Sequence, residues 1–427
     1  MTVVAIEPLR KPLDAVARIP GSKSITNRAL LLAALADGVS TLSGVLFSDD
    51  SHWFLDGLER LGVAVEVDQS QAQVRVHGVG GAPPTAAAEL WVELAGTAAR
   101  FLLAYAALGR GRYTIDGTAR MRQRPMADLI ATLNTLGANC RSLGEHGGLP
   151  IEVAGDGLRG GAAELAGDKT SQFLSALLMV APYAAHDVEL TMTSRLAATP
   201  YIDITTTMMA DFGAQVEREG YERFHVAAGQ RYQARAYQIE PDASNASYFF
   251  AAAALSGGRV RVEGLSRQSI QGDVCFLDVL EQMGCTISAT ERGVDVRGPS
   301  QLHGVDLDMS KLPDMAITLA ALAPFADRPT TIRNVALIRH HETDRIAAVV
   351  AELRKLGVAV DEHSDGMTIF PGWQGPAEID AHHDHRMAMG FAVVGLRIPG
   401  VRIRGAEAVA KTFPDFFERF AMLGAAA

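Results

Sequence analysis

The sequence predicts an α/β protein of two domains, each made of three copies of one repeating unit. Three observations support this prediction. A glycine recurs at near-even spacing after helix-like segments, a second series of small-residue turns opens apolar helices, and short stretches alternate apolar and polar residues. A length of 427 residues is consistent with two or three domains.

The first series is a short phrase in which an apolar residue lies four positions before a glycine. It reads LERLGVAV at residues 58–65 and LRKLGVAV at 353–360. A helix that ends at a C′ glycine and then turns into a strand explains the phrase. The glycines recur at intervals of 67 to 76 residues and are Gly62, Gly137, Gly213, Gly284, Gly357 and Gly424.

The second series runs in phase with the first and predicts the other helix of each unit. Its members are GSKSITNRALLLAALA, AGTAARFLLAYAAL, DKTSQFLSALLMVA, DASNASYFFAAAAL, LPDMAITLAALA and DHRMAMGFAVVGL. Period-2 stretches such as QVRVHGV and RVRVEGL predict strands. Each unit is therefore expected to run strand, helix, strand, helix, strand. Because the units carry different polar residues, a solenoid with a repeating binding surface is disfavoured.

The two ends of the chain are expected to meet in one domain. The last unit stops after its helix and lacks strands that the N-terminal segments VVAIEPL and DAVARIP could supply. With three units in each half, we expect a first domain at residues 22–240. The second domain then comprises residues 1–21 and 241–427, closed by the N-terminal strands.

Composition limits the classes of function. A net charge of −10 disfavours general binding to nucleic acid or to anionic membranes. The longest apolar runs, such as residues 173–185, are too short to cross a bilayer, and the first residues lack the layout of a signal peptide. Cys140, Cys275 and Cys285 lie in apolar segments and form no disulfide framework. These features predict a cytoplasmic protein.

The stretch Gly21-Ser22-Lys23-Ser24 is similar to the end of a nucleotide-binding loop, but Ser22 stands where that loop needs a glycine. What remains is a turn that can offer backbone N–H groups, a lysine and two hydroxyls to an anion. Comparable turns open the other helices and are rich in cations. They contribute Arg28, Arg100, Arg120, Arg122, Arg124, Lys169, Arg345, Arg386 and Lys411.

These turns predict a site for two or more small anions, with a few carboxylates for proton transfer. Simpler interpretations remain open for individual residues. Glu342 and Asp344 could form i,i+3 ion pairs, and Arg100 could pair with a backbone carbonyl. The histidines at 340, 341, 382, 383 and 385 show no H-E-x-x-H pattern and have no nearby cysteine, so a metal site is disfavoured.

The motifs together resemble those of the EPSP synthase (3-phosphoshikimate 1-carboxyvinyltransferase) family, over essentially the whole chain and in order. The matching motifs are PGSKSITNRALLLAALADG, AGTAARF, RPM, TSQFLSALL, HETDRI, DHRMAM and AKTFPDFF. The resemblance implies a two-domain inside-out α/β barrel, with three βαβαββ repeats in each domain and the active site in the interdomain cleft. It also implies a monomer without cofactor or metal, acting in the shikimate pathway of aromatic amino acid biosynthesis.

The resemblance implies transfer of the enolpyruvyl group of phosphoenolpyruvate to the 5-hydroxyl of shikimate 3-phosphate, with release of phosphate. The implied catalytic residues are Asp314 as base, and Glu342 with Lys23 for proton transfer to the methylene carbon. The implied phosphoenolpyruvate ligands are Lys23, Gly96, Arg124, Gln172, Arg345, Arg386 and Lys411. The implied shikimate 3-phosphate ligands are Lys23, Ser24, Arg28, Thr170, Ser171, Gln172, Tyr201, Asp314 and His341.

The sequence departs from the commonest family pattern at Leu94, Ala198, Leu337 and His341, and has Thr170 where a serine is usual. Lys169 could compensate for the hydroxyl groups that are missing on the shikimate 3-phosphate side. A paralogue with a different acceptor is therefore the alternative function. The sister transferase acting on UDP-N-acetylglucosamine typically has a cysteine within the segment TARMRQRPM, which has none here. A noncatalytic anion-binding protein would not need two carboxylates beside its cations. The resemblance further implies sensitivity to glyphosate, for which Gly96 leaves room, although Phe101 replaces a common proline.

Overall fold

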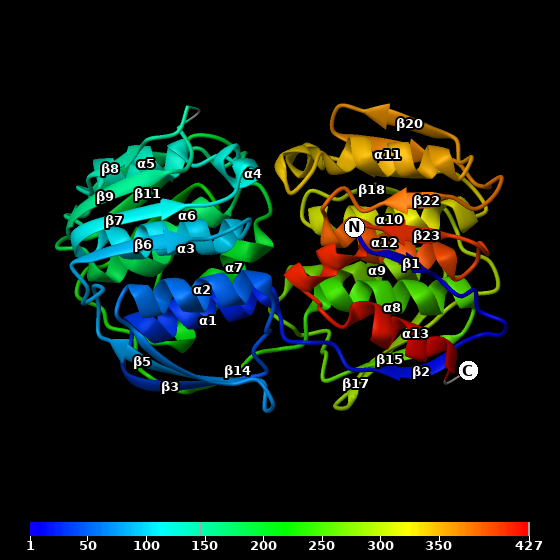
Figure 1. Cartoon of the computed structure of the whole chain (residues 1–427), viewed down its shortest axis with the longest axis horizontal. Coiled ribbons are helices and arrows are strands. Elements are labelled where there is room, and N and C mark those ends of the chain that lie inside the picture. The colour runs from blue at the N-terminus through cyan, green and yellow to red at the C-terminus, as the bar shows by residue number, and fades with distance from the viewer. Residues whose placement is uncertain (146, 426–427) are drawn as a thin grey trace. The chain divides into compact units, whose positions relative to one another are not determined.

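The computed structural model describes residues 1–145 and 147–425. Contacts within the chain divide it into two compact units. The inserted unit is Gly21–Ile239, and the terminal unit combines Met1–Pro20 with Glu240–Ala427. Each unit is built from three βαβαββ repeats, so every repeat has one more strand than the alternating pattern predicted (Figure 1).

The inserted unit contains the first three repeats. In the first repeat the elements are α1 (Lys23–Leu35), β3 (Asp37–Ser43), α2 (Asp49–Arg60), β4 (Ala64–Asp68) and β5 (Gln73–Val79). In the second they are β6 (Ala87–Trp91), α3 (Gly96–Ala107), β7 (Arg110–Asp116), α4 (Ala119–Arg122), α5 (Ala127–Thr135), β8 (Cys140–Ser142) and β9 (Ile151–Asp156). In the third they are β10 (Gly161–Leu165), α6 (Gln172–Val180), β11 (Val188–Met192), α7 (Pro200–Asp211), β12 (Glu217–Glu219) and β13 (Arg223–Val226).

Each repeat of the inserted unit forms a four-stranded sheet of the same topology. The strand orders are β14-β3-β5-β4, β6-β7-β9-β8 and β10-β11-β13-β12. The first strand of each sheet runs parallel to its neighbour, and the other pairs are antiparallel. In the first repeat this strand is β14 (Ala236–Gln238), which returns from the far end of the unit to pair with Thr41–Ser43. Figure 1 shows β14 beside β3.

The terminal unit contains the other three repeats. The fourth repeat has β2 (Asp14–Ala17), α8 (Ala243–Ser256), β15 (Arg259–Glu263), α9 (Phe276–Gln282), β16 (Thr286–Thr290) and β17 (Gly293–Arg297). The fifth has β18 (Asp306–Asp308), a 3₁₀ turn at Pro313–Met315, α10 (Ala316–Leu322), β19 (Thr330–Arg333), α11 (Arg345–Lys355), β20 (Val360–His363) and β21 (Gly366–Ile369). The sixth has β22 (Glu378–Asp380), α12 (His385–Gly395), β23 (Arg402–Arg404), a 3₁₀ segment at Ala406–Lys411 and α13 (Phe416–Ala425).

The N-terminal segments complete two different sheets of this unit. Strand β1 (Val3–Ala5) pairs antiparallel with β23, so VVAIEPL supplies a strand to the last repeat as predicted. The segment DAVARIP does not, because its strand β2 runs parallel to β15 in the fourth repeat. The sheet of the sixth repeat, in the order β1-β23-β22, therefore has three strands among the described residues.

The core of each unit is formed by the helices that the second series predicted. All residues of α3 and α12 are buried, as is every residue of α8 except Ser256. Helices α1, α3 and α6 contact one another, and so do α8, α10 and α12. Strand β15, by contrast, alternates buried and partly exposed residues, as a strand with one covered face does. Buried helices with outer sheets are the arrangement that the predicted inside-out fold requires.

The recurring glycines behave as predicted in five places. Gly62, Gly137, Gly213, Gly284 and Gly357 have φ between 77° and 103°, the left-handed region that ends helices. The sixth prediction is wrong, because Gly424 lies inside α13. Among the cysteines, Cys140 and Cys285 are buried, but Cys275 is exposed, contrary to its apolar sequence surroundings. None of the helices described is long and apolar enough to span a bilayer.

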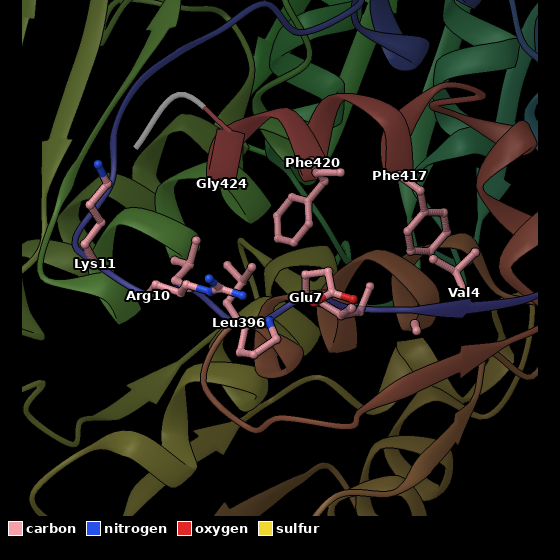
Figure 2. A pocket seen from close by; sticks show the side chains of 13 residues that line it. Val4, Glu7, Arg10, Lys11, Leu396, Phe417, Phe420 and Gly424 are labelled. Carbon is pink, nitrogen blue, oxygen red and sulfur yellow. The ribbon is translucent and has the colours of Figure 1, made fainter.

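A cavity of about 490 Å³ lies in the terminal unit between residues 4–11 and α13. Figure 2 shows Glu7 and Arg10 on one side of it and Phe417 and Phe420 on the other. None of the residues predicted to bind or transform substrate lines this cavity.

Candidate active site

The predicted site residues cluster where buried helices begin, in one group for each unit. In the inserted unit, Lys23, Gly96 and Gln172 are the first residues of α1, α3 and α6. Free backbone N–H groups and the helix dipole favour anions at such positions. These three helices contact one another, so their polar residues are brought into one region of the unit.

Arg28 is the most deeply held cation of the inserted unit. Its Nε donates to Thr205 Oγ1 at 2.8 Å, and its Nη2 donates to Ser175 Oγ at 3.0 Å and to the carbonyl of Tyr201 at 3.1 Å. Its Nη1 donates to the carbonyl of Ser24 at 2.9 Å. Burial lowers the pKa of Arg28 to about 10. Arg28 therefore ties α1 to α6 and α7, a structural task that the sequence did not reveal.

Two arginines enclose Gly96 at the start of α3. A methyl group on Gly96 would lie 2.5 Å from Arg124 Nη1 and 2.9 Å from Arg100 Nη1. Arg124 donates to the carbonyl of Leu94 at 3.3 Å. Arg100 donates to Gln172 Oε1 at 2.5 Å as well as to backbone carbonyls, so the simple backbone interpretation of Arg100 was incomplete. A residue without a side chain at position 96 lets both guanidinium groups approach the helix terminus.

The remaining predicted residues of this unit lie in the same turns. Lys23 Nζ is 3.6 Å from Asp50 Oδ2, and Asp50 is buried at the start of α2. Thr170 accepts a hydrogen bond from the backbone N–H of Gln172, and Ser171 is buried. Lys169 pairs with Asp128 at 2.7 Å. The hypothesis that Lys169 binds substrate phosphate would therefore require this ion pair to break.

Arg345 is the centre of the group in the terminal unit. Its Nε and Nη2 donate to the two carboxylate oxygens of Asp384 at 2.7 and 3.1 Å. Its Nη2 also donates to Glu342 Oε2 at 3.0 Å, and its Nη1 donates to Asp314 Oδ1 at 2.8 Å. Burial by itself would lower the pKa of Arg345, but the three carboxylates raise this pKa above its ordinary value.

Asp314, at the N-terminal end of α10, joins the two predicted carboxylate-binding arginines. Its Oδ2 accepts from Arg386 Nη2 at 2.9 Å, while its Oδ1 accepts from Arg345. His341 Nδ1 lies 3.8 Å from Asp314 Oδ1 and accepts from Arg345 Nη1 at 2.9 Å. Charge-assisted contacts of this kind hold a carboxylate in a fixed orientation.

Glu342 lies between two cations. Its Oε2 contacts Arg345, an i,i+3 pair as the simpler interpretation predicted, and its Oε1 is 3.8 Å from Lys411 Nζ. The side chains of Glu342 and Lys411 are 8% and 10% exposed, so both are screened little by solvent. The i,i+3 pair therefore belongs to a larger buried network and is more than a surface contact.

Asp273 is a further buried carboxyl near this network, and sequence reasoning missed it. Burial, followed by repulsion from Asp314, raises its pKa to about 7. Arg386 and a hydrogen bond from Ser244 Oγ act in the opposite direction. Tyr248 hydroxyl accepts a long contact from Arg386 Nη1 at 3.5 Å, and burial raises its pKa to about 12.

Asp384 was noted in the sequence but was not predicted as a site residue. It is fully buried, caps α12 by accepting from the backbone N–H of Arg386, and binds Arg345 through both oxygens. Its place before an apolar helix was a signal for the cap. Its pairing with Arg345, 39 residues earlier, had no sequence signal.

The structure thus gathers the predicted residues into two sets. The set in the inserted unit is Lys23, Ser24, Arg28, Gly96, Arg124, Thr170, Ser171, Gln172 and Tyr201. The set in the terminal unit is Asp314, His341, Glu342, Arg345, Arg386 and Lys411. Within the part of the chain that the structure describes, no group of three or more His, Cys, Asp or Glu residues is arranged to hold a metal ion.

Comparison with known proteins gives one consistent result. A sequence model of the family described as EPSP synthase (3-phosphoshikimate 1-carboxyvinyltransferase) matches residues 9–420. The chain is 53% identical over 420 residues to the 3-phosphoshikimate 1-carboxyvinyltransferase of Trichormus variabilis, covering 98% of this chain and 99% of that protein. It is 48% identical over 410 residues to the enzyme of the same name from Shewanella sp. strain MR-7, covering 95% and 96%.

Solved structures agree with the sequence relatives. An EPSP synthase from Acinetobacter baumannii superimposes with a TM-score of 0.83 at 27% identity, covering 99% of this chain and 98% of that one. A similarity of this extent spans both units and the motifs from which the two sets of site residues come.

Proposed function

Because the chain belongs to the EPSP synthase family, we propose specific roles for its two sets of charged residues in the reaction of that family. The protein is a transferase of the shikimate pathway, a 3-phosphoshikimate 1-carboxyvinyltransferase. It transfers the enolpyruvyl group of phosphoenolpyruvate to the 5-hydroxyl of shikimate 3-phosphate and releases phosphate. We further propose that it acts in the cytoplasm as a monomer.

The reaction needs a base at the attacking hydroxyl and an acid at the methylene carbon. The 5-hydroxyl oxygen attacks C2 of phosphoenolpyruvate while C3 gains a proton, which gives a tetrahedral intermediate. Loss of phosphate and of a proton from C3 then restores the vinyl group. Asp314 is the proposed base, and Glu342 with Lys23 is the proposed acid and base at C3.

The cations of both sets are proposed to hold the two anionic substrates. Arg345 and Arg386 bind the carboxylate of phosphoenolpyruvate, because guanidinium groups match the geometry of a carboxylate. Lys23, the Gly96 N–H, Arg124, Gln172 and Lys411 bind its phosphate. Shikimate 3-phosphate is bound by Ser24, Arg28, Thr170, Ser171 and Tyr201, together with His341, Lys23, Gln172 and Asp314. In the described structure Arg28 makes four protein contacts, so it would also hold the phosphate-binding turn in place.

The observation that carries the proposal is the buried network around Arg345. Asp314 and Glu342 both contact this one guanidinium group, at 2.8 and 3.0 Å, and Arg386 and Lys411 each contact one of the two carboxylates. Two acid–base carboxylates are therefore held among cations that can bind an anion. A protein that only bound anions would gain nothing from carboxylates that repel its ligand.

The test is phosphate release from phosphoenolpyruvate in the presence of shikimate 3-phosphate, with controls that lack either substrate. We expect the wild type to release phosphate only with both substrates, and Asp314→Asn to lower kcat by about 10²- to 10⁴-fold. Asp306→Asn is a matched control in the same repeat, because Asp306 pairs with Arg333 on the exposed surface. Unchanged kcat in Asp314→Asn would refute the role of the base, and binding of phosphoenolpyruvate without release would indicate a different acceptor.

A further inference from the structure

The turn before α12 has an unfavourable backbone conformation. His382 and His383 have φ of 50° and 56°, in the left-handed region that residues other than glycine seldom occupy. Two such residues in succession persist only when surrounding contacts hold them. This turn leads directly into Asp384 and Arg386. Whatever holds the turn therefore also holds the N-terminal end of α12.

Helix α11 contacts this turn at two points that lie seven residues apart. Arg345, in its first turn, binds both oxygens of Asp384. Glu352, two turns later on the same face, accepts from His382 Nε2 at 2.7 Å and from the backbone N–H of Asp380 at 3.1 Å. The turn from Asp380 to Asp384 is thus fastened to one helix at both of its ends.

Glu352 is suited to fasten the turn because of its surroundings. Its side chain is 1% exposed, and a buried carboxylate is tolerated only when it is paired and hydrogen-bonded. Lys355 Nζ, which is more exposed, lies 2.7 Å from Glu352 Oε2 on the same helix. The contacts of Glu352 with the turn connect elements 28 and 30 residues apart, whereas the Lys355 contact is local.

We propose that Glu352 is a positioning residue that fixes the 380–384 turn and thereby sets the position of Arg386 for phosphoenolpyruvate. This inference rests on the proposed role of Arg386 in binding the substrate carboxylate. Asp380 contributes by accepting from the backbone N–H of His382 at 2.8 Å, which reinforces the left-handed turn. Without the hydrogen bonds to Glu352, Asp384 and Arg386 would be held through Arg345 and Asp314 alone.

The experiment compares Glu352→Met, Glu352→Gln and Lys355→Met in the full-length protein. Methionine fills a similar volume but cannot accept the two hydrogen bonds, whereas glutamine retains an acceptor for the Asp380 N–H and a polar group for His382. Lys355→Met is the matched control, because it removes the local partner of Glu352 and leaves the turn contacts. Two quantities are measured: amide hydrogen exchange in peptides covering residues 380–387, and the KM for each substrate.

For Glu352→Met we expect about tenfold faster exchange at 380–387 and a rise of about tenfold in the KM for phosphoenolpyruvate, the change that removal of one well-placed contact produces. The KM for shikimate 3-phosphate should change by less than about twofold. Glu352→Gln should recover most of both effects, and Lys355→Met should match the wild type. A purely volume-filling role would make methionine and glutamine equivalent, and that result would overturn the proposal.

Two further results separate the possible failures. Wild-type exchange and wild-type KM values in Glu352→Met would refute the positioning role while leaving the proposed function intact. If the wild type released no phosphate, the proposed function would fail, but the exchange experiment would still decide whether Glu352 holds the turn. Should Glu352→Met fail to fold, His382→Gly keeps the left-handed φ accessible and removes the imidazole. It is expected to raise the KM for phosphoenolpyruvate at least about threefold, and an unchanged KM there counts against the proposal.

Discussion

At the scale of single residues, Asp273 connects the charge network to the stability of the protein. Its carboxyl is buried, hydrogen-bonded by Ser244, and close enough to Asp314 and Arg386 to be affected by both charges. Asp242 is a further nearby carboxylate that disfavours ionisation. Since burial raises the pKa of Asp273 to about 7 from an ordinary 3.8, the folded protein holds this proton over a pH range in which the unfolded chain has lost it.

The sign of the resulting pH dependence follows from this raised pKa. Below pH 3.8 the carboxyl is protonated in both states, and its contribution to stability is fully present. Between pH 3.8 and about 7 the unfolded chain ionises first, so stability falls as pH rises. Above about pH 7 both states are ionised and the contribution has been lost.

Asp273→Asn cannot ionise and should remove this decline. We expect the Tm of the variant relative to the wild type to increase from about pH 5 to about pH 7.5 and then level off. Thermal unfolding at several pH values measures this difference. Asp306→Asn is the control: Arg333 lowers the pKa of Asp306, so that group stays ionised across the range and the difference should be flat. Parallel curves for Asp273→Asn and the wild type would refute the prediction.

The sequence could identify residues of the site better than it could identify their partners. Asp314, Glu342 and Arg386 each belong to a recognisable motif at a helix start, and the structure connects all three through Arg345 or Asp314. Asp273 and Glu352 could not be found in this way. Their functions depend on groups distant in sequence, and a buried carboxylate within a helix has no signature until its partners are known.

At the scale of elements, the recurring glycine provides a direct comparison between two helix ends. Gly357 has φ of 77°, and a methyl group there would lie 2.6 Å from Gln374 Cβ. Gly424 is inside α13, where the nearest atom to an added methyl group would be Leu9 Cδ2 at 3.7 Å. The two glycines look equivalent in the sequence, but only Gly357 adopts a conformation that other residues avoid.

The prediction is that alanine has opposite effects at these two positions. Gly357→Ala should lower the free energy of unfolding by about 1–2 kcal/mol, because alanine strains a left-handed residue and here also meets Gln374. Gly424→Ala should be neutral or stabilising by up to about 1 kcal/mol, because alanine favours a helix. Denaturant unfolding of the two variants measures both values. Equal decreases would mean that Gly424 ends its helix after all.

At the scale of the whole molecule, the sequence allowed the repeat to be recognised but left the sheet partners undetermined. Periodicity predicted β5 over Gln73–Val79, and the structure confirms these limits. It could not predict that β2 joins the fourth repeat, because the partner of an edge strand is chosen by tertiary packing. Strand β14 has three residues, too few for a period-2 signal, yet it completes the first sheet.

The closure of that first sheet leads to a prediction about the inserted unit. All strands of its three sheets, β14 included, come from residues 21–239. A fragment of these residues therefore contains every partner of its own sheets and should fold alone with a cooperative unfolding transition. A fragment of residues 21–233 lacks β14 and leaves β3 with an unpaired edge, so it should unfold at a lower temperature.

The same fragment separates binding from chemistry. Residues 21–239 include Ser24, Arg28, Ser171 and Tyr201, proposed to bind shikimate 3-phosphate, but not Asp314. Isothermal titration should therefore detect weakened binding of shikimate 3-phosphate, while phosphate release should be absent because the proposed base is missing. Phosphate release by the fragment would contradict the role of Asp314. A folded fragment without measurable affinity would instead show that binding depends on residues of the terminal unit, of which Asp314 and His341 are the proposed contributors.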